Sequence, residues 1–338
     1  MYNQLRTRCR WSLIFLTIYF SPIFSLAQKQ DVKSRIHTPA EILKVMEQSQ
    51  ITYEINIDDS LAPAVVDSPI VLSNQLWLKK DEHGYTLVHF DLSDAAAETL
   101  KSAEEAFQKK DFDSALRLYL AVQKLEPAYH HIWTLIGDVF YSQGQYEKAK
   151  EHFEKVVANN FADYNAHWFL GDAEWQLGRK KEAIREITIA HLLNVNHQAL
   201  KKVLLNYRDQ FKRPWKDWQF APRFSLSLDD KKVVVKFATD WMGYALVKAV
   251  WKYEPGYAES MSGPEYETLV VNMLEEKEAL VSLLAHNEKL KLINKIIEDG
   301  YVNEFIYYEL LAKRAPMAIV LLPQEDFMRL AEYIEKYH

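Results

Sequence analysis

The sequence predicts a mainly α protein. An α-solenoid of three helical hairpins with a capping helix is flanked by a small α/β N-terminal segment and an α+β C-terminal domain. Three observations support this. Small residues recur with a 34-residue period between residues 96 and 197, an amphipathic stretch follows at 198–212, and both flanks hold short apolar runs separated by turn residues. A length of 338 residues accommodates two or three domains.

The 34-residue period is the most specific pattern in the chain. Position one of each unit is Ala96, His130 or Tyr164. Positions eight and twenty are small, which lets two antiparallel helices approach closely: Ala103, Gly137, Gly171, Ala115, Ala149 and Ala183. Position twenty-four is large and apolar: Tyr119, Phe153 and Ile187. Position fifteen, where the chain turns between the helices, is Lys110, Gly144 and Gly178.

These columns resemble the tetratricopeptide repeat (TPR) family over residues 96–197. The middle unit matches best, through Trp133, Ile136, Gly137, Phe140, Gly144, Tyr146, Ala149 and Phe153. The first unit is degenerate in its first helix, and the third has Glu174 where an aromatic residue is usual. The usual proline, present as Pro127, is replaced by Phe161 and Val195. The resemblance implies a superhelix whose concave face receives a protein or peptide segment.

The same resemblance implies which side chains face the groove. They come from positions five, nine and twelve: Glu104, Phe107, Thr134, Asp138, Tyr141, Trp168, Asp172 and Trp175, with Leu100 also at position five. Stacked repeats would form an acidic column beside an aromatic column, suited to a partner segment with Lys or Arg. The alternative is that the carboxylates are solvated and the aromatic rings pack between hairpins. The Lys and Asn pattern of a carboxylate clamp is absent.

Residues 1–27 have the layout of a secretory signal peptide. Three arginines precede an apolar run at 11–26, and Ser25 and Ala27 stand at the −3 and −1 positions of a cleavage site. Pro22 interrupts the run, which is shorter than the roughly 20 residues that a spanning helix needs. We expect cleavage, no stable membrane span afterwards, and a periplasmic or extracellular protein. An uncleaved membrane anchor is the minor alternative.

Composition and motifs narrow the function. Removing residues 1–27 leaves 38 basic and 47 acidic residues, a formal net charge of −9, without a dense basic block, which argues against nucleic-acid binding. The one cysteine, Cys9, is in the removed segment. HExxH, GxSxG, phosphate-loop and dinucleotide motifs are absent from the sequence. We therefore expect no enzyme, cofactor or metal site, and interpret the histidines at 130, 131, 191 and 197 as surface or packing residues.

Residues 31–94 form the predicted N-terminal segment. Thr38 to Glu41 reads as a capping box with Pro39 at the first helical position. Residues 51–57 alternate like a strand, and 75–79 with 85–90 read as a hairpin. The segment either caps the array or extends a sheet elsewhere.

Residues 95–212 are the array, whose capping helix is 198–212. Residues 213–338 read as the α+β domain. Strands are predicted at 224–228, 233–237 and 317–323, and helices at 239–252, 264–286, 288–299, 301–313 and 324–337. The cluster Glu275–Glu278 is interpreted as a solvated helix face.

Three hypotheses for the function remain open. In the first, the chain is an exported scaffold or adaptor that binds a partner protein. In the second, the C-terminal domain is an enzyme or small-ligand domain with polar groups around Trp241, Lys248 and Glu254; the alternative there is a core helix. In the third, the repeats mediate self-association.

Overall fold

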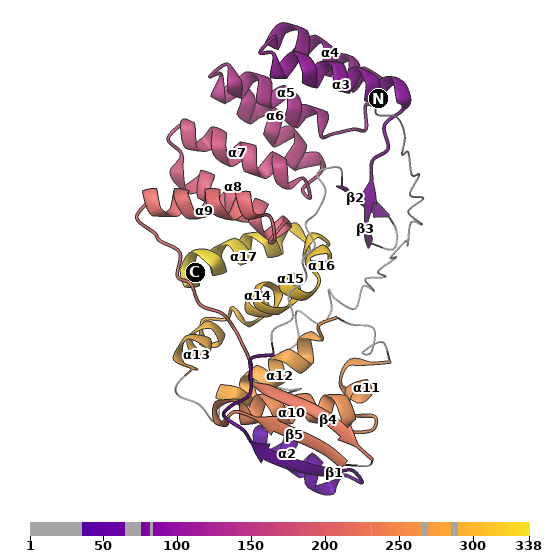
Figure 1. Cartoon of the computed structure of the whole chain (residues 1–338), viewed down its shortest axis with the longest axis vertical. Coiled ribbons are helices and arrows are strands. Elements are labelled where there is room, and N and C mark those ends of the chain that lie inside the picture. The colour runs from indigo at the N-terminus through magenta and orange to yellow at the C-terminus, as the bar shows by residue number, and fades with distance from the viewer. Residues whose placement is uncertain (1–35, 65–75, 82–83, 231, 265–269, 285–289) are drawn as a thin grey trace, which may run out of the picture.

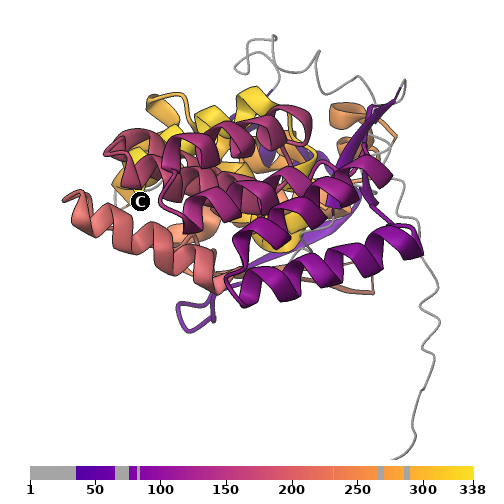
Figure 2. The ribbon, with the colours of Figure 1, turned by 90° about the horizontal axis from the view of Figure 1, so that it is seen from above.

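The computed structural model describes residues 36–64, 76–81, 84–230, 232–264, 270–284 and 290–338. The helices stack along the long axis of the molecule, and a small sheet lies at one end of the stack (Figure 1). Seen from above, the array overlaps the C-terminal helices, so that the two parts form one column (Figure 2). The predicted fold class, a mainly α solenoid of helical hairpins with a sheet-containing part, is confirmed.

The array lies within residues 84–230, which are described without a break. Three antiparallel hairpins are followed by a capping helix: α3 (Asp94–Gln108), α4 (Phe112–Leu125), α5 (Ile132–Ser142), α6 (Tyr146–Asn159), α7 (Tyr164–Gln176), α8 (Lys180–Leu193) and α9 (Gln198–Gln210). Each helix packs against the next one along the chain. The hairpins therefore bury their apolar faces mainly against sequence neighbours.

Close helix approach explains the small residues of the repeat. A Cβ atom on Gly137 would lie 2.5 Å from Cε1 of Phe153, and one on Gly171 would lie 2.7 Å from Cγ1 of Ile187. Both glycines are thus required by packing. The turn glycines have a different reason, because Gly144 takes φ +73°, which favours glycine. In the degenerate first unit Lys110 takes the same conformation at φ 61° without that freedom.

Helix α8 joins the array to the C-terminal part. It is buried from Ala183 to Leu193 except at Arg185. Helix α7 packs on it from the array, while α16 (Pro316–Val320) and α17 (Gln324–Tyr337) pack on it from the C-terminal part. A helix covered on more than one side needs apolar residues around most of its circumference, and Ile187, Ile189, Ala190, Leu192 and Leu193 supply them.

The sheet contains strands from both flanks of the array. Strand β5 (Lys232–Phe237) is central, β4 (Phe224–Asp229) pairs with it antiparallel, and β1 (Thr52–Ile57) pairs with it parallel. Helix α2 (Pro39–Gln48) opens with the predicted capping box at Thr38 and packs on α10 (Met242–Tyr253). The strand and helix at 38–57 therefore extend the C-terminal sheet, one of the two alternatives that the sequence left open.

Two predictions about the flanks are wrong. Residues 317–323 are not the third strand: Pro316 opens the short helix α16, and β1 takes that place in the sheet. A short apolar run does not distinguish a buried strand from a buried helix by periodicity. The predicted segment 31–94 also divides, because β2 (Leu76–Asp81) and β3 (Gly84–His89) form a hairpin of their own while α2 and β1 join the sheet.

The remaining C-terminal elements differ from the prediction in two places: a short helix at Tyr257–Ser262 was not predicted, and the helix predicted at 264–286 is described from Met273 to Leu284. They are a 3₁₀ turn (Thr239–Trp241), α11 (Tyr257–Ser262), α12 (Met273–Leu284), α13 (Lys291–Glu298), α14 (Val302–Phe305), a π-helical segment (Ile306–Leu311) and α15 (Ala312–Arg314). Gly300, at φ +81°, follows the end of α13. Among the described helices, none combines the length and apolar character that a membrane crossing requires.

Candidate functional site

The eight predicted groove residues lie on the first helix of each hairpin. Glu104 and Phe107 come from α3, Thr134, Asp138 and Tyr141 from α5, and Trp168, Asp172 and Trp175 from α7. The structure brings only some of them together as the sequence predicts, and the three positions of the repeat behave differently.

Position nine places three carboxylates in a row, hereafter the acidic column: Glu104, Asp138 and Asp172. All three are half-buried. Burial, and then the negative charges of Glu104 and Asp172, raise the pKa of Asp138 to about 6. Burial likewise raises the pKa of Asp172 to about 6, against the opposing effect of its hydrogen bonds. The column is therefore a run of like charges partly withdrawn from water.

Tyrosine hydroxyls stabilise the two ends of the acidic column. Tyr119 on α4 donates to Glu104 at 2.7 Å, and Tyr207 on the capping helix donates to Asp172 at 2.6 Å. For Asp138, the middle member, no hydrogen-bond or ion-pair partner is found within the described ranges. Asp138 is thus the carboxylate with the most unused acceptor capacity.

The position-twelve aromatic residues pack inside the molecule. Phe107 contacts Phe112 edge-on at 5.8 Å, and Tyr141 contacts Tyr146 in the same way at 5.2 Å. Both partners lie at the start of the second helix of the same hairpin. These rings are half-buried, and they follow the packing alternative more closely than the idea of a free aromatic column.

Trp175, the third position-twelve residue, contacts both an aromatic ring and a lysine. It stacks on Tyr207 with the ring centroids 4.0 Å apart, and Nζ of Lys180 lies 3.7 Å from its ring centroid. The capping helix, which carries Tyr207, therefore occupies the space beside the third repeat.

At position five the prediction is wrong for Thr134. Its side chain is fully buried, and its Oγ1 has no hydrogen-bond partner in the described residues. It cannot contact a ligand without unpacking α5. Trp168, at the equivalent place on α7, is half-buried and lies edge-on to His197, the N-cap residue of α9.

A buried pair that the sequence did not predict lies between the second and third repeats. His131 and Asp163 approach to 2.6 Å, and Asp163 also accepts from the backbone N–H of Ala166 as the N-cap of α7. Burial alone would lower the pKa of His131, but Asp163 raises it above its ordinary value. An Asp directly before a predicted helix was the available signal, since that is an N-cap position. The interpretation of His131 as a packing residue agrees with this contact.

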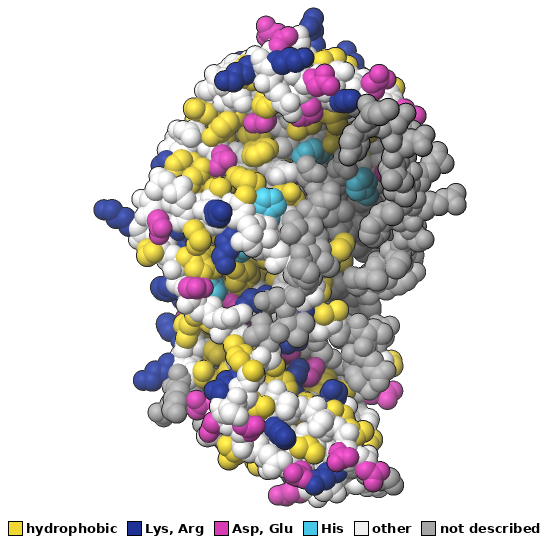
Figure 3. All heavy atoms as spheres, in the orientation of Figure 1, with side chains coloured by type: hydrophobic (Ala, Val, Ile, Leu, Met, Phe, Trp, Pro, Cys, Tyr) yellow, Lys and Arg dark blue, Asp and Glu magenta, His cyan; other side chains and the backbone are white. Residues whose placement is uncertain are grey.

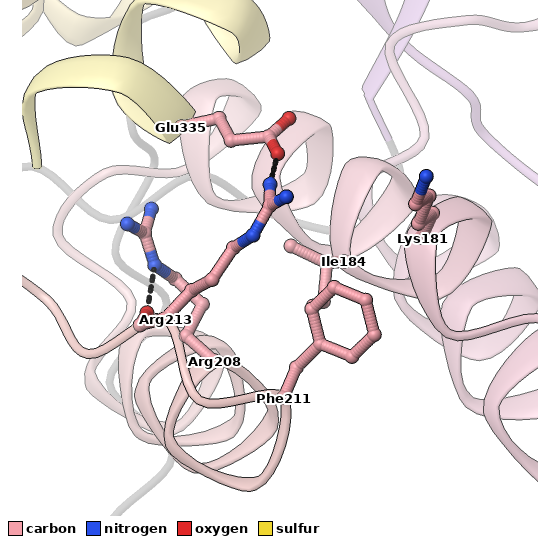
Figure 4. Close-up of a pocket in the computed structure, with 6 residues that line it drawn as sticks. All are labelled: Lys181, Ile184, Arg208, Phe211, Arg213 and Glu335. Atoms are coloured by element: carbon pink, nitrogen blue, oxygen red, sulfur yellow. Dashed lines mark hydrogen bonds and ion pairs between the residues drawn. The ribbon is translucent and has the colours of Figure 1, made fainter.

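The end of the array is fastened to the C-terminal part around Arg208 (Figure 4). Its Nε donates to the carbonyl oxygen of Arg213 at 3.1 Å, and Nη1 donates to that of Ile334, near the C-terminal end of α17, at 3.2 Å. Arg213 pairs with Glu335 beside it (Figure 4). A cation at a helix C-terminus is favourable, which explains a buried arginine held by carbonyl groups.

The C-terminal residues singled out in the sequence pack in the interior. Trp241 is buried, Lys248 pairs with Glu275 at 2.5 Å and Glu276 at 3.0 Å, and Glu254 accepts from Tyr53 at 2.9 Å. The core-helix alternative thus describes α10.

The interpretation of Glu275–Glu278 as a solvated face is wrong, because Glu276 and Glu278 are fully buried. Glu276 accepts from Tyr244 and Lys248, and Glu278 from Trp251 and Tyr257. Buried carboxylates require such partners.

Surface charge on the face of Figure 3 is mixed. Acidic and basic side chains are interspersed over the array on that face, without a large patch of one sign (Figure 3). Within the described residues, no group of three or more His, Cys, Asp or Glu side chains is placed to hold a metal ion.

Comparison with known proteins identifies the family of the repeat region. The family model described as tetratricopeptide repeat matches residues 100–159 and, overlapping, 134–188. Anaphase-promoting complex subunit 3 of Schizosaccharomyces pombe is 26% identical over 181 residues, 52% of this chain and 27% of that protein. Protein bimA of Emericella nidulans is 24% identical over 145 residues, 42% of this chain and 18% of that protein. The chain therefore spans about a quarter or less of the length of these relatives.

Among solved structures, the Sgt2 TPR domain from Aspergillus fumigatus is similar with a TM-score of 0.34 and 19% sequence identity, over 41% of this chain and 91% of that domain. The family match, the 34-residue period and the stacked hairpins agree on the same region. Residues 100–188 are tetratricopeptide repeats.

Proposed function

We propose that the array is a scaffold that binds a protein or peptide segment, and that a Lys or Arg side chain of this segment pairs with the acidic column. The observation that carries the proposal is Asp138. It is half-buried, lies between two further carboxylates, and has no counter-charge within the described ranges. The name of one relative identifies it as a subunit of a multiprotein complex, which agrees with a role in assembly.

The physical reason is the cost of an ionised Asp138 in the unbound array. Burial, and then the negative charges of Glu104 and Asp172, raise the pKa of Asp138, so its ionised form is destabilised at neutral pH. A cation placed against Asp138 offsets this destabilisation and forms a charge-assisted hydrogen bond. Contacts from aromatic rings play a smaller part than the sequence suggested, because Phe107, Tyr141 and Trp175 are occupied by packing.

The test compares two labelled peptides, one with spaced Lys residues and one in which each Lys is Gln. We expect saturable binding of the Lys peptide by fluorescence anisotropy and much weaker binding of the Gln peptide. Asp138→Asn should weaken binding of the Lys peptide roughly tenfold or more, since it removes one charge-assisted hydrogen bond. The double variant Asp138→Lys with Asp172→Lys should abolish binding.

The matched control is Asp113→Asn, which removes an exposed carboxylate from α4 and leaves the column intact. Because Tyr207 hydrogen bonds to Asp172, the double variant is accepted only if its circular dichroism matches that of the wild type. Equal binding by the wild type and Asp138→Asn, with both folded, would remove the acidic column from the function.

We further propose that the chain acts outside the cytoplasm, in the periplasm or the extracellular space. The arginines and apolar run of residues 1–27 support this, although that segment lies outside the described residues. Mass spectrometry of the protein from its host should find Gln28 as the first residue. Recovery of the chain with residues 1–27 attached would contradict cleavage. Size determination of the same sample tests the self-association hypothesis.

A further inference from the structure

A polar cavity of about 300 Å³ lies where the array meets the C-terminal helices. Its wall includes residues from the end of α8, from α9, from the connection at 211–223, from the π-helical segment with α15, and from the end of α17. The ones that matter here are His191, Lys201, Trp215, Trp218, Lys313 and His338. A volume of about 300 Å³ is at the lower end of the range for small-molecule sites.

Aromatic packing fixes one side of this cavity. The ring of Trp218 stacks on His338 with centroids 4.9 Å apart, and its Nε1 donates to the carbonyl oxygen of Tyr337 at 3.1 Å. Trp215 lies against the same imidazole at 4.8 Å. Because these side chains hold one another in place, the wall is formed before any ligand arrives.

One basic side chain of the wall, Lys201, is not neutralised by a carboxylate of the described part of the chain. The buried carboxylate, Glu309, is fully used: Nζ of Lys313 donates to it at 2.9 Å, Nε2 of His338 at 2.8 Å and the hydroxyl of Tyr333 at 3.2 Å. Lys201 has no carboxylate within ion-pair distance in the described residues, and its Nζ lies 5.9 Å from the Trp215 ring centroid.

Besides Glu309, the wall includes Asp217, which is exposed so that water screens its charge, and the α-carboxylate of His338. Burial, and then Lys201 and His338, lower the pKa of His191 to about 3. His191 is therefore neutral at pH 7.

The two histidines of the wall also have unused hydrogen-bonding capacity. Nε2 of His191 is 3.0 Å from the hydroxyl of Tyr308, and Nε2 of His338 is bonded to Glu309. Nδ1 of each ring is buried without a partner among the described residues. Tyr308 and Glu309 lie on the π-helical segment, a geometry that is rare and frequently found at functional sites.

We propose that this cavity binds a small polar organic anion, one that carries a carboxylate or a phosphate group, with Lys201 as its charge partner. The site is separate from the acidic column and does not rest on the proposed peptide binding. A bound anion would contact the array through Lys201 and the C-terminal part through the wall at Lys313, so it would stabilise the junction of the two.

The experiment uses isothermal titration of the purified chain with succinate and with glycerol 3-phosphate. Glycerol and putrescine serve as the neutral and cationic counterparts. We expect saturable binding of at least one anion and none of the two counterparts, and the better anion identifies the charged group. Lys201→Gln should weaken the binding roughly tenfold or more, as loss of a charge-assisted hydrogen bond implies. Lys202→Gln, its exposed neighbour on the same helix, should bind as the wild type does.

The binding result for Lys201→Gln is interpreted only if the melting temperature of the ligand-free variant matches that of the wild type. Weaker binding with an unchanged melt supports the site. The proposal is overturned if neither anion binds at millimolar concentration, if putrescine binds as well as the anions do, or if Lys201→Gln and Lys202→Gln lose binding equally.

Discussion

The array and the sheet-containing part, which is the three-stranded sheet with α2 and the C-terminal helices, differ in how far apart in the sequence their contacting residues lie. In the array, Gly137 faces Phe153 and Gly171 faces Ile187, so that partners lie within one hairpin. In the other part, β1 pairs with β5 and the backbone N–H of His37 donates to Glu278, 241 residues away. The array therefore tolerates local disturbance as a stack of units does, whereas the sheet-containing part depends on groups supplied from both flanks of the chain.

The largest expected effect is in the sheet-containing part. Glu276→Gln removes the buried charge that faces Lys248 and Arg314, and should lower the free energy of unfolding by about 3–5 kcal/mol. Urea unfolding measures this. Glu275→Gln is the control, because Glu275 also pairs with Lys248 but is partly exposed, and its replacement should have a much smaller effect. Similar values for the two variants would show that burial does not set the importance of this cluster.

A packing change in the array should have a smaller effect. Gly171→Ala places a Cβ atom 2.7 Å from Cγ1 and 2.8 Å from Cδ1 of Ile187, and should destabilise by about 1–3 kcal/mol after the gain in helix propensity. In an Ile187→Val background, which lacks Cδ1, the same substitution should cost less. A cycle without coupling between the two positions would contradict this helix contact.

The acidic column should oppose stability at neutral pH. Because the folded-state pKa of Asp138, about 6, exceeds its ordinary value of 3.8, the folded state holds this proton more tightly. The resulting stability is present below the unfolded-state pKa and is lost as the pH rises through 6. Asp138→Asn should therefore stabilise the chain by about 1 kcal/mol at pH 7, because water screens part of the shift, and by much less near pH 4.

Wild-type binding of the Lys peptide should rise over the same pH interval as Asp138 ionises. Thermal melts and anisotropy from pH 4 to 8 measure both effects. Destabilisation of the chain by Asp138→Asn at pH 7 would mean that Asp138 is held by a favourable contact.

The smallest expected effect tests whether the N-terminal helix belongs to the sheet-containing part. Thr38→Ala removes the capping box of α2 and should destabilise by about 1 kcal/mol. Hydrogen exchange should locate the change in α2, α10 and the sheet. Thr99→Ala in α3, where the hydroxyl bonds only to the carbonyl of Ala95, should be nearly neutral. Increased exchange in the array on Thr38→Ala would show that the two parts unfold together.

Local contacts explain how much the sequence could predict. The hairpins, their turns at Gly144 and Gly178 and the capping helix followed from one period, because each contact repeats every 34 residues. The acidic column was expected from the resemblance to the tetratricopeptide repeat family, which implies the repeat positions that face the groove. The tyrosines that donate to its ends were not expected, since Tyr207 lies beyond the third repeat and only the packing of α9 on α7 brings it to Asp172.

The sheet-containing part shows where such reasoning stops. Glu276 and Glu278 are charged residues on a helix, and by pattern they belong on a surface. Their burial depends on Lys248, Arg314 and Trp251, which a helical period does not place beside them. The apolar run at 317–323 was predicted to be a strand, but its first part lies in α16, and the third strand of the sheet, β1, comes from the other flank.

The parallel pairing of β1 with β5 sets an order of events during synthesis. Thr52 pairs with Lys232, so β1 leaves the ribosome about 180 residues before its partner, a delay of roughly 10–40 s at usual rates of elongation. In that interval the three hairpins can complete their local contacts. Tyr53, Ile55 and Ile57 of β1 do not yet have β5 as their partner strand. Until β5 has been synthesised, the edge of β1 that pairs with it therefore has no partner strand.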